Sequence, residues 1–247
     1  MLVAAALVPD TALLVPGAAG SADVLDDLRA AALDAVAEVL RGDPETVVVV
    51  APGRGHGHGH RMLGGSVRLS LAAAGIPDAL LRWPAADITL RDEDQDDAAP
   101  SVASIVGLHL LVRAGRSTGL RVAETSNAVR VGALTALGRE LVADGPTALV
   151  VVGSLSGRHG PDAPLADDPR ALVLDARLLA DLAEATPAAR DRLSATDPEL
   201  ADELAVRGWA PWQVLLGAAV DRPVRARLLA DEVAFGAQHG VLVWTLA

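Results

Sequence analysis

A short, uninterrupted apolar segment constrains the fold of this chain more than any other feature. Residues Ala148–Val152 are all apolar, are rich in β-branched side chains and are followed directly by Gly153. An apolar run this short, with no polar residue on either alternating face, predicts a strand buried on both sides of a parallel sheet. The sequence that follows, as far as Arg170, is polar, rich in glycine and proline, and much longer than a turn requires. Loops that leave the carboxyl ends of such strands are where α/β proteins bind their ligands.

Two earlier segments have the same design. Residues Thr46–Ala51 form a second apolar run, which is followed by the glycine- and histidine-rich sequence GRGHGHGHR. Residues Leu2–Val8 form a third run, which is followed by a proline and Asp10. We expect the three strands to lie in one sheet, because parallel strands of this composition are buried together. Asp10, the His56–His60 loop and His159 should then open onto one cleft at the carboxyl ends of these strands.

The rest of the chain alternates between further strands and helices. Apolar residues that recur at spacings of three and four predict helices, several of which begin at a Ser, Asn or Asp cap. The predicted helices are residues 21–40, Leu63–Ala74, Val102–Ala114, 127–143, Pro169–Glu184, Pro198–Val206 and Pro211–Val220. The further predicted strands are Ala79–Trp83, Leu120–Ala123 and Gly240–Leu246. The acidic segment Pro84–Pro100 is predicted to be a solvated loop. His109 lies inside an almost wholly apolar helix and is expected in the core. This alternation predicts one α/β domain over residues 1–247, with a largely parallel central sheet and helices on both faces.

Composition argues against several classes of function. The chain has 247 residues, of which 51% are hydrophobic, and carries a formal net charge of −11. An acidic chain without a basic cluster argues against nucleic acid and anionic membranes as partners. We expect a small-molecule ligand, and the composition is compatible with both a monomer and a homo-oligomer. The sequence contains no cysteine, which excludes disulfides, thiolate metal ligands and cysteine nucleophiles. The first residues lack the basic region of a signal peptide and no segment is long enough to span a bilayer, so we expect a cytoplasmic protein.

Two groups of histidines are candidates for chemistry. His56, His58 and His60 alternate with glycine, so an extended loop would place the imidazoles on one side, where they could hold a divalent metal. The alternative is a flexible, solvated loop, because alternate glycines raise the entropic cost of ordering a site. His159 follows a predicted strand and has an unperturbed pKa near neutrality, which suits a general acid or base. The alternative for His159 is a hydrogen bond to the backbone of its own loop.

The serines that follow the central strand do not form a known nucleophile motif. The segment Gly153–Gly157 has Leu155 at its centre, whereas a nucleophile elbow needs a central serine. No Gly-Lys-Ser/Thr sequence follows, so the segment is not a phosphate loop either. Ser154, Ser156 and Arg158 are instead candidate contacts to a substrate.

Five segments carry a resemblance to a known family. They are residues Val8–Pro16, Val47–Gly55, Val151–Asp175, Arg207–Ala219 and Phe235–Trp244, and together they span nearly the whole chain. In these segments the chain resembles the LigB-like superfamily, the fold of the catalytic subunits of class III extradiol dioxygenases, and specifically a small actinobacterial branch of it. The resemblance implies a single α/β domain. For the catalytically active members it also implies one ferrous ion, held by two histidines and a glutamate, with a further histidine as acid and base.

Residue by residue, the resemblance implies an altered metal site. Asp10 stands where the family has its first histidine ligand, and aspartate is able to ligate iron. A glycine and Arg54 stand at the place of the second histidine, so that only the displaced His56–His60 loop substitutes for it. His159 matches the acid-base histidine with a small shift, and Glu232 is a loose counterpart of the glutamate ligand.

Two functions follow as hypotheses. One is a metal-dependent, oxygenase-type enzyme for a small aromatic or related substrate, with Fe(II) or another divalent metal at Asp10, the His56–His60 loop and Glu232. The other is a non-catalytic protein that has lost this metal triad and binds a small anionic molecule through a two-pronged contact from Arg54. Arg54 beside a divalent metal would be an uncompensated cation, which favours the second hypothesis. His239 flanks the last predicted strand, and it either faces the site or lies at a strand edge.

Overall fold

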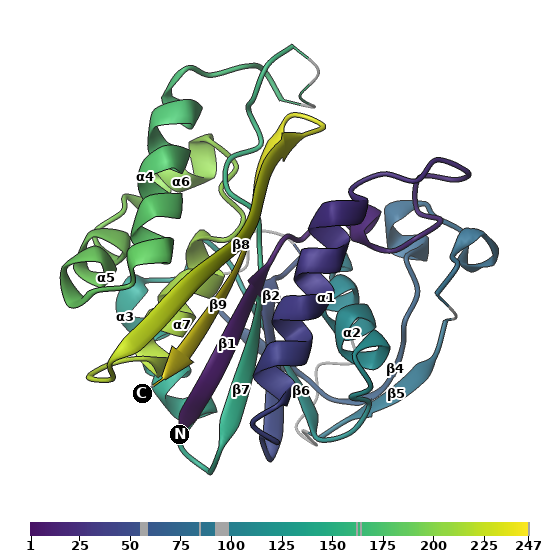
Figure 1. Ribbon diagram of the computed structural model, residues 1–247, viewed down its shortest axis with the longest axis horizontal. Coiled ribbons are helices and arrows are strands. Elements are labelled where there is room, and N and C mark those ends of the chain that lie inside the picture. Colours follow the sequence, from purple (N-terminus) through teal and green to yellow (C-terminus); the bar gives the residue numbers. More distant parts are fainter. Residues whose placement is uncertain (55–58, 84, 92–98, 162, 164, 247) are drawn as a thin grey trace.

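The computed structural model describes residues 1–54, 59–83, 85–91, 99–161, 163 and 165–246. Its main feature is a seven-stranded sheet that runs through the middle of the molecule (Figure 1). The strands are β1 (Leu2–Val8), β2 (Thr46–Pro52), β3 (Arg61–Leu63), β6 (Leu120–Thr125), β7 (Thr147–Val152), β8 (Val224–Ala234) and β9 (Ala237–Leu246). They lie in the order β3-β6-β2-β7-β1-β9-β8.

The centre of the sheet is parallel. Strands β6, β2, β7 and β1 pair in parallel, whereas β9 pairs antiparallel with β1, β8 with β9, and β3 with β6. The prediction that Leu2–Val8, Thr46–Ala51 and Ala148–Val152 share one sheet is confirmed. The predicted fold class, an α/β domain with a mostly parallel central sheet, is confirmed as well.

Helices cover both faces of the sheet, which is why the central strands are apolar on both sides. Val47 and Val49 of β2 pack into one layer, and Val48 and Val50 pack into the other, because successive strand residues point to opposite faces. The first layer contains α1 (Asp26–Leu40) and α2 (Val102–Arg113), and the second contains α3 (Val131–Leu141), α4 (Arg170–Glu184), α5 (Pro187–Ser194), α6 (Pro198–Glu203) and α7 (Trp209–Ala218). Within the described residues, none of these helices combines the length and apolar character needed to cross a membrane. With both faces covered, a ligand reaches the sheet at the ends of its strands.

The segment after β3 differs from the sequence-based prediction. The predicted helix Leu63–Ala74 is wrong: the chain forms strand β4 (Gly65–Arg68) and then a 3₁₀ turn at Ala72–Ala74. Glycine is the physical reason, since Gly65 adopts a φ of 70°, which a right-handed helix does not allow.

The next segment differs too. Strand β5 (Asp87–Leu90) pairs with β4 in a separate two-stranded sheet, although the prediction places this acidic stretch in a loop. The predicted strand Ala79–Trp83 is also wrong. A 3₁₀ turn occupies Asp78–Leu80, and the backbone of Arg82 donates to the carbonyl of Pro16 at 2.8 Å instead of joining a sheet.

His109 lies in the core, as the sequence predicts. Its side chain is 2% exposed and contacts the ring of Trp83, and its Nε2 atom has no hydrogen-bond partner among the described residues. Burial lowers the pKa of His109 from 6.5 to about 4, and the nearby charge of Asp78 opposes this only in part. The core therefore accepts the imidazole in its uncharged form.

We expect acid to destabilise the protein through His109. Below pH 6.5 the unfolded chain gains a proton on this residue that the folded chain takes up only near pH 4, so the free energy of unfolding falls as the pH falls. Between pH 6.5 and pH 5 this contribution should amount to about 1.5 kcal/mol. Urea unfolding at both pH values measures it. His109→Leu should lose this part of the pH dependence, whereas His60→Leu, at an exposed histidine, should keep it. The same pH dependence in wild type and His109→Leu would contradict the expectation.

Candidate functional site

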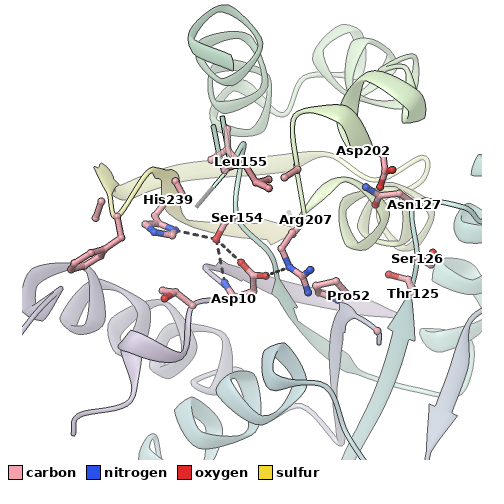
Figure 2. Close-up of a pocket in the computed structure, with 18 residues that line it drawn as sticks. Asp10, Pro52, Thr125, Ser126, Asn127, Ser154, Leu155, Asp202, Arg207 and His239 are labelled. Carbon is pink, nitrogen blue, oxygen red and sulfur yellow. Dashed lines mark hydrogen bonds and ion pairs between the residues drawn. The ribbon is translucent and has the colours of Figure 1, made fainter. Parts of the chain in front are cut away.

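A cleft opens where the parallel strands end, as the sequence predicts. Its volume is about 620 Å³. Each central strand supplies a residue to its lining: Asp10 follows β1, Gly53 follows β2, Thr125 ends β6 and Ser154 follows β7 (Figure 2). The turn between β8 and β9 and the segment before α7 form the other walls. This is the position at which open α/β sheets bind ligands.

Four polar side chains form a continuous chain of contacts in the cleft (Figure 2). Ser154 Oγ donates to Asp10 Oδ1 at 2.6 Å and lies 3.0 Å from Nδ1 of His239. The other carboxylate oxygen of Asp10, Oδ2, accepts a hydrogen bond from Nε of Arg207 at 2.5 Å. Ser154 therefore links the carboxylate of Asp10 to the imidazole of His239.

Burial determines the protonation state of His239 in this chain of contacts. Burial lowers the pKa of His239 below its usual value, and the charge of Asp10 and a hydrogen bond with the backbone of Ala234 oppose the shift in part. At neutral pH the imidazole is therefore uncharged, and it lies one hydroxyl group away from a carboxylate. A neutral imidazole is able to accept a proton. The hydroxyl group of Ser154, which lies between the imidazole and the carboxylate, is able to transfer a proton between them. The arrangement can thus hold and move a proton next to a ligand.

Backbone pairing brings Ser154 to His239. The amide of Leu155 donates to the carbonyl of Gln238 at 3.1 Å, and the amide of Gln238 donates to the carbonyl of Ser156 at 3.0 Å. The loop that leaves β7 thus continues alongside the start of β9. His239 follows Gln238 directly, so its ring meets the hydroxyl of Ser154.

Arg207 reaches the cleft because the chain before α7 lies tightly against the end of β7. The amide of Gly208 donates to the carbonyl of Ser154 at 2.9 Å. Only glycine at position 153 permits this approach, since a Cβ atom on Gly153 would lie 2.4 Å from Cα of Gly208. Arg207 cannot be recognised as a site residue from the sequence, because no local pattern connects it to Asp10, almost two hundred positions earlier.

A second polar network joins the loop after β7 to α4. Asp175 accepts hydrogen bonds from the amide of Ser156 at 3.0 Å and from its hydroxyl at 2.5 Å, and Nε2 of His159 lies 2.6 Å from the same carboxylate. The side chain of His159 is 6% exposed. Neither His159 nor Ser156 is among the described residues that line the cleft. The expectation that His159 opens onto the cleft is therefore not met, because α4 supplies a buried carboxylate that binds the imidazole.

The other predicted contacts also lie away from the cleft. Arg54 and His60 are exposed, and the described lining of the cleft does not include them. Arg158 donates to the carbonyl of Glu203 at 2.5 Å, which ties the loop after β7 to α6, and to the carbonyl of Ala166 in its own loop at 3.0 Å. Glu232 lies within β8, opposite His239 in the strand register, and it too is outside the described lining. Of the predicted residues, the structure brings Asp10 and Ser154 together in the cleft, and His239 joins them.

The predicted metal ligands do not form a cluster in the part of the chain that the structure describes. No group of three or more histidine, aspartate or glutamate side chains there could hold a metal ion. His56 and His58 lie outside the described residues. Both carboxylate oxygens of Asp10 already have partners, the hydroxyl of Ser154 and the cation of Arg207, and this cation opposes the approach of a metal. The described residues therefore do not fit the ferrous site that the resemblance implies.

Comparisons with known proteins bear on the fold. No family model matches the sequence, and no curated protein matches it. Among solved structures, the chain is similar to the crystal structure of the uncharacterized protein JW3007 from Escherichia coli K12. The TM-score is 0.54 at 16% sequence identity, and the match covers 98% of this chain and 99% of that chain. The likeness establishes the fold alone. Membership of the LigB-like superfamily stays a prediction.

Proposed function

We propose that the protein binds a small, partly apolar molecule that carries a carboxylate or phosphate group. The convergence of Asp10, Ser154, Arg207 and His239, from four separate segments, in one cleft of about 620 Å³ carries this proposal. A cleft of this size with a few convergent polar groups is typical of a small-molecule site. The proposal keeps the cytoplasm as the location of the protein, and the acidic charge of the chain argues against nucleic acid and anionic membranes as partners.

Arg207 supports the choice of an anionic ligand. Its side chain is 53% exposed, and its Nε atom is the donor that binds Asp10. The two terminal nitrogens of its guanidinium group have no hydrogen-bond partner in the described part of the chain. They are therefore open to a two-pronged contact with a carboxylate or phosphate, the contact that the sequence predicts for Arg54.

The remaining walls of the cleft support an apolar body on the ligand. Pro52, Leu155, Leu165 and Phe235 line it together with the polar residues. Phe235 lies in the turn between β8 and β9 and exposes its ring. An aromatic or short aliphatic group would be removed from water between these side chains, which favours binding.

We expect Arg207→Gln to weaken the binding of a small aromatic anion by about ten- to a hundredfold, since a hydrogen bond to a charged group contributes roughly 1.5–3 kcal/mol. Calorimetric titration with benzoate and phenyl phosphate measures this, and neutral benzamide serves as the uncharged probe. Arg113→Gln, at an exposed arginine of α2, is the matched control and should bind as the wild type does. The proposal fails if neither anion binds, or if benzamide binds as tightly as benzoate and Arg207→Gln changes nothing.

A metal-dependent, oxygenase-type enzyme for a small aromatic substrate is the second candidate function. In its favour, Ser154 joins Asp10 and His239 in one cleft, and both residue types ligate divalent metals. Against it, the Arg207 cation binds Asp10, and the described residues contain no group of three possible ligands. Ferrous iron added without oxygen to protein purified without a histidine tag, followed by metal analysis and a catechol assay, tests this candidate. Stoichiometric iron and ring opening, both lost in Asp10→Ala and His239→Ala, would establish it in place of a binding protein.

A further inference from the structure

A second cleft lies at the other end of β8. Its volume is about 650 Å³, and it is bounded by the last turn of α3, the start of α5, the end of α7 and residues 220–224, which lead into β8. These elements gather on one side of the sheet, below the α4 helix in the view of Figure 1. The first cleft is at the opposite end of β8, where the strand turns into β9. The described linings of the two clefts have no residue in common, so they are separate sites.

Three arginines line the second cleft. Arg139 lies in the last turn of α3, Arg190 lies in α5, and Arg222 lies in the turn before β8. Among the described residues, the acidic side chains in the same lining are Asp191 and Asp221. The chain as a whole has 21 basic residues against 32 acidic ones, so a cleft in which arginine outnumbers aspartate is opposite in charge balance to the chain as a whole.

Few hydrogen bonds or ion pairs with described residues occupy the guanidinium groups of these arginines. The side chains of Arg139 and Arg222 have no hydrogen bond or ion pair with any described residue, although two aspartates share the cleft. Nη1 of Arg190 donates to the carbonyl of Ala219 at 2.7 Å, which fixes its guanidinium group. The Nε atom of Arg190 is buried and has no partner in the described structure. The other terminal nitrogen of Arg190, Nη2, also has no partner among the described residues and is not buried, so an anion in the cleft would supply an acceptor for it.

Helix electrostatics explains two of the three. Arg139 is in the last turn of α3, where a cation interacts favourably with the helix dipole. Arg190 donates to the carbonyl of Ala219, the C-cap of α7, which is also a favourable place for a cation. Arg222 lies outside the helices and has no such explanation.

We propose that this second cleft binds a polyvalent oxyanion, a small molecule with two or more phosphate or carboxylate groups, through Arg139, Arg190 and Arg222. Guanidinium groups make paired, charge-assisted hydrogen bonds with such oxygens. Three of them around one cleft match several negative charges, whereas Arg207 in the first cleft matches one. The site is thus additional to the one in which the small aromatic anion binds.

Calorimetric titration of the full chain with pyrophosphate and with citrate, at constant ionic strength, tests the proposal. We expect saturable binding of at least one of them, at one site per chain. Arg139→Gln and Arg222→Gln should each weaken this binding about tenfold. Both variants should fold, because neither side chain contacts a described residue through a hydrogen bond or ion pair, and thermal unfolding checks this. Arg207→Gln, in the first cleft, and Arg113→Gln, on the surface of α2, should leave the affinity unchanged.

Three results would overturn the proposal. The first is that neither probe saturates. The second is that Arg113→Gln weakens binding as much as the cleft variants do, which would show general attraction to positive charge. The third is that Arg207→Gln abolishes binding while Arg139→Gln and Arg222→Gln do not, which would place the anion in the first cleft. Saturable binding of citrate alone or of pyrophosphate alone supports the proposal and identifies the oxyanion as carboxylate or phosphate.

Discussion

Replacement of Asp175 by alanine is expected to lower the free energy of unfolding by about 3–5 kcal/mol, because several buried groups lose a hydrogen-bond partner at a cost of about 1–3 kcal/mol each. The buried carboxylate accepts hydrogen bonds from the amide and the hydroxyl of Ser156 and binds the ring of His159. Without it, these groups stay in the protein interior with no partner, and the free energy cost of removing each from water is no longer offset by a hydrogen bond. The same contacts hold the loop that carries Ser154, so the affinity of the first cleft for benzoate should fall as well. Urea unfolding and calorimetry measure the two effects.

Asp34→Ala is the matched control for this experiment. Asp34 also lies in the middle of a helix, α1, but its side chain is exposed. Its replacement should change the free energy of unfolding by no more than about 0.5 kcal/mol. If Asp175→Ala costs less than about 1 kcal/mol, the network does not stabilise the loop and His159 is available for another role.

Gly138→Ala is expected to cost about 3 kcal/mol, because it forces two helices apart. The helices α3 and α7 cross at a pair of glycines. A Cβ atom on Gly138 would lie 2.0 Å from the carbonyl oxygen of Val214, and one on Gly217 would lie 2.1 Å from the carbonyl oxygen of Thr135. Both obstacles are backbone atoms, so no side-chain rotation relieves the clash. The whole contact between the helices must open, which exposes apolar surface on both.

Gly132→Ala, in the same helix, provides the control. A Cβ atom on Gly132 would meet no atom within 4 Å, so alanine should stabilise the helix there by about 0.5 kcal/mol. The two substitutions should therefore change the free energy of unfolding in opposite directions, as measured by urea denaturation. A stabilising effect of Gly138→Ala would show that the helices do not cross as closely as described.

The parallel centre of the sheet is predictable because burial on both faces leaves a direct mark on the sequence. The three runs Leu2–Val8, Thr46–Ala51 and Ala148–Val152 are continuous and apolar, and all three are central strands. Strand β8 is at the edge of the sheet, and its sequence, VRARLLADEVA, mixes charged residues with alanine and leucine, which suit a helix equally well. Its pairing with β9 makes it a strand, and pairing between distant segments leaves no local pattern.

Only part of the candidate site is predictable from the sequence, as is the case for the fold. Asp10 and Ser154 are predictable because each follows a buried parallel strand, and parallel strands gather their carboxyl ends at one edge. Arg207 and His239 come from the segment before α7 and from an antiparallel strand, so no rule of spacing places them there. His159 shows the limit of the rule: its place after a strand predicts that it is near the cleft, but the partner of its ring, Asp175, comes from the next helix.

Strand β1 leaves the ribosome before either of its neighbours in the sheet has been synthesised. On one side it pairs with β7, and on the other Ala4 pairs with Thr245 of β9. During translation, β1 therefore remains unpaired along both edges until β7 and β9 have been made. Apolar strands with unpaired edges tend to pair with other chains and aggregate. A nascent chain that is released before β9 is complete keeps one of these edges open, even when β7 has already docked. Premature termination in this region should thus yield aggregates or chaperone-bound chains, and the yield of folded protein should depend on the last residues of β9.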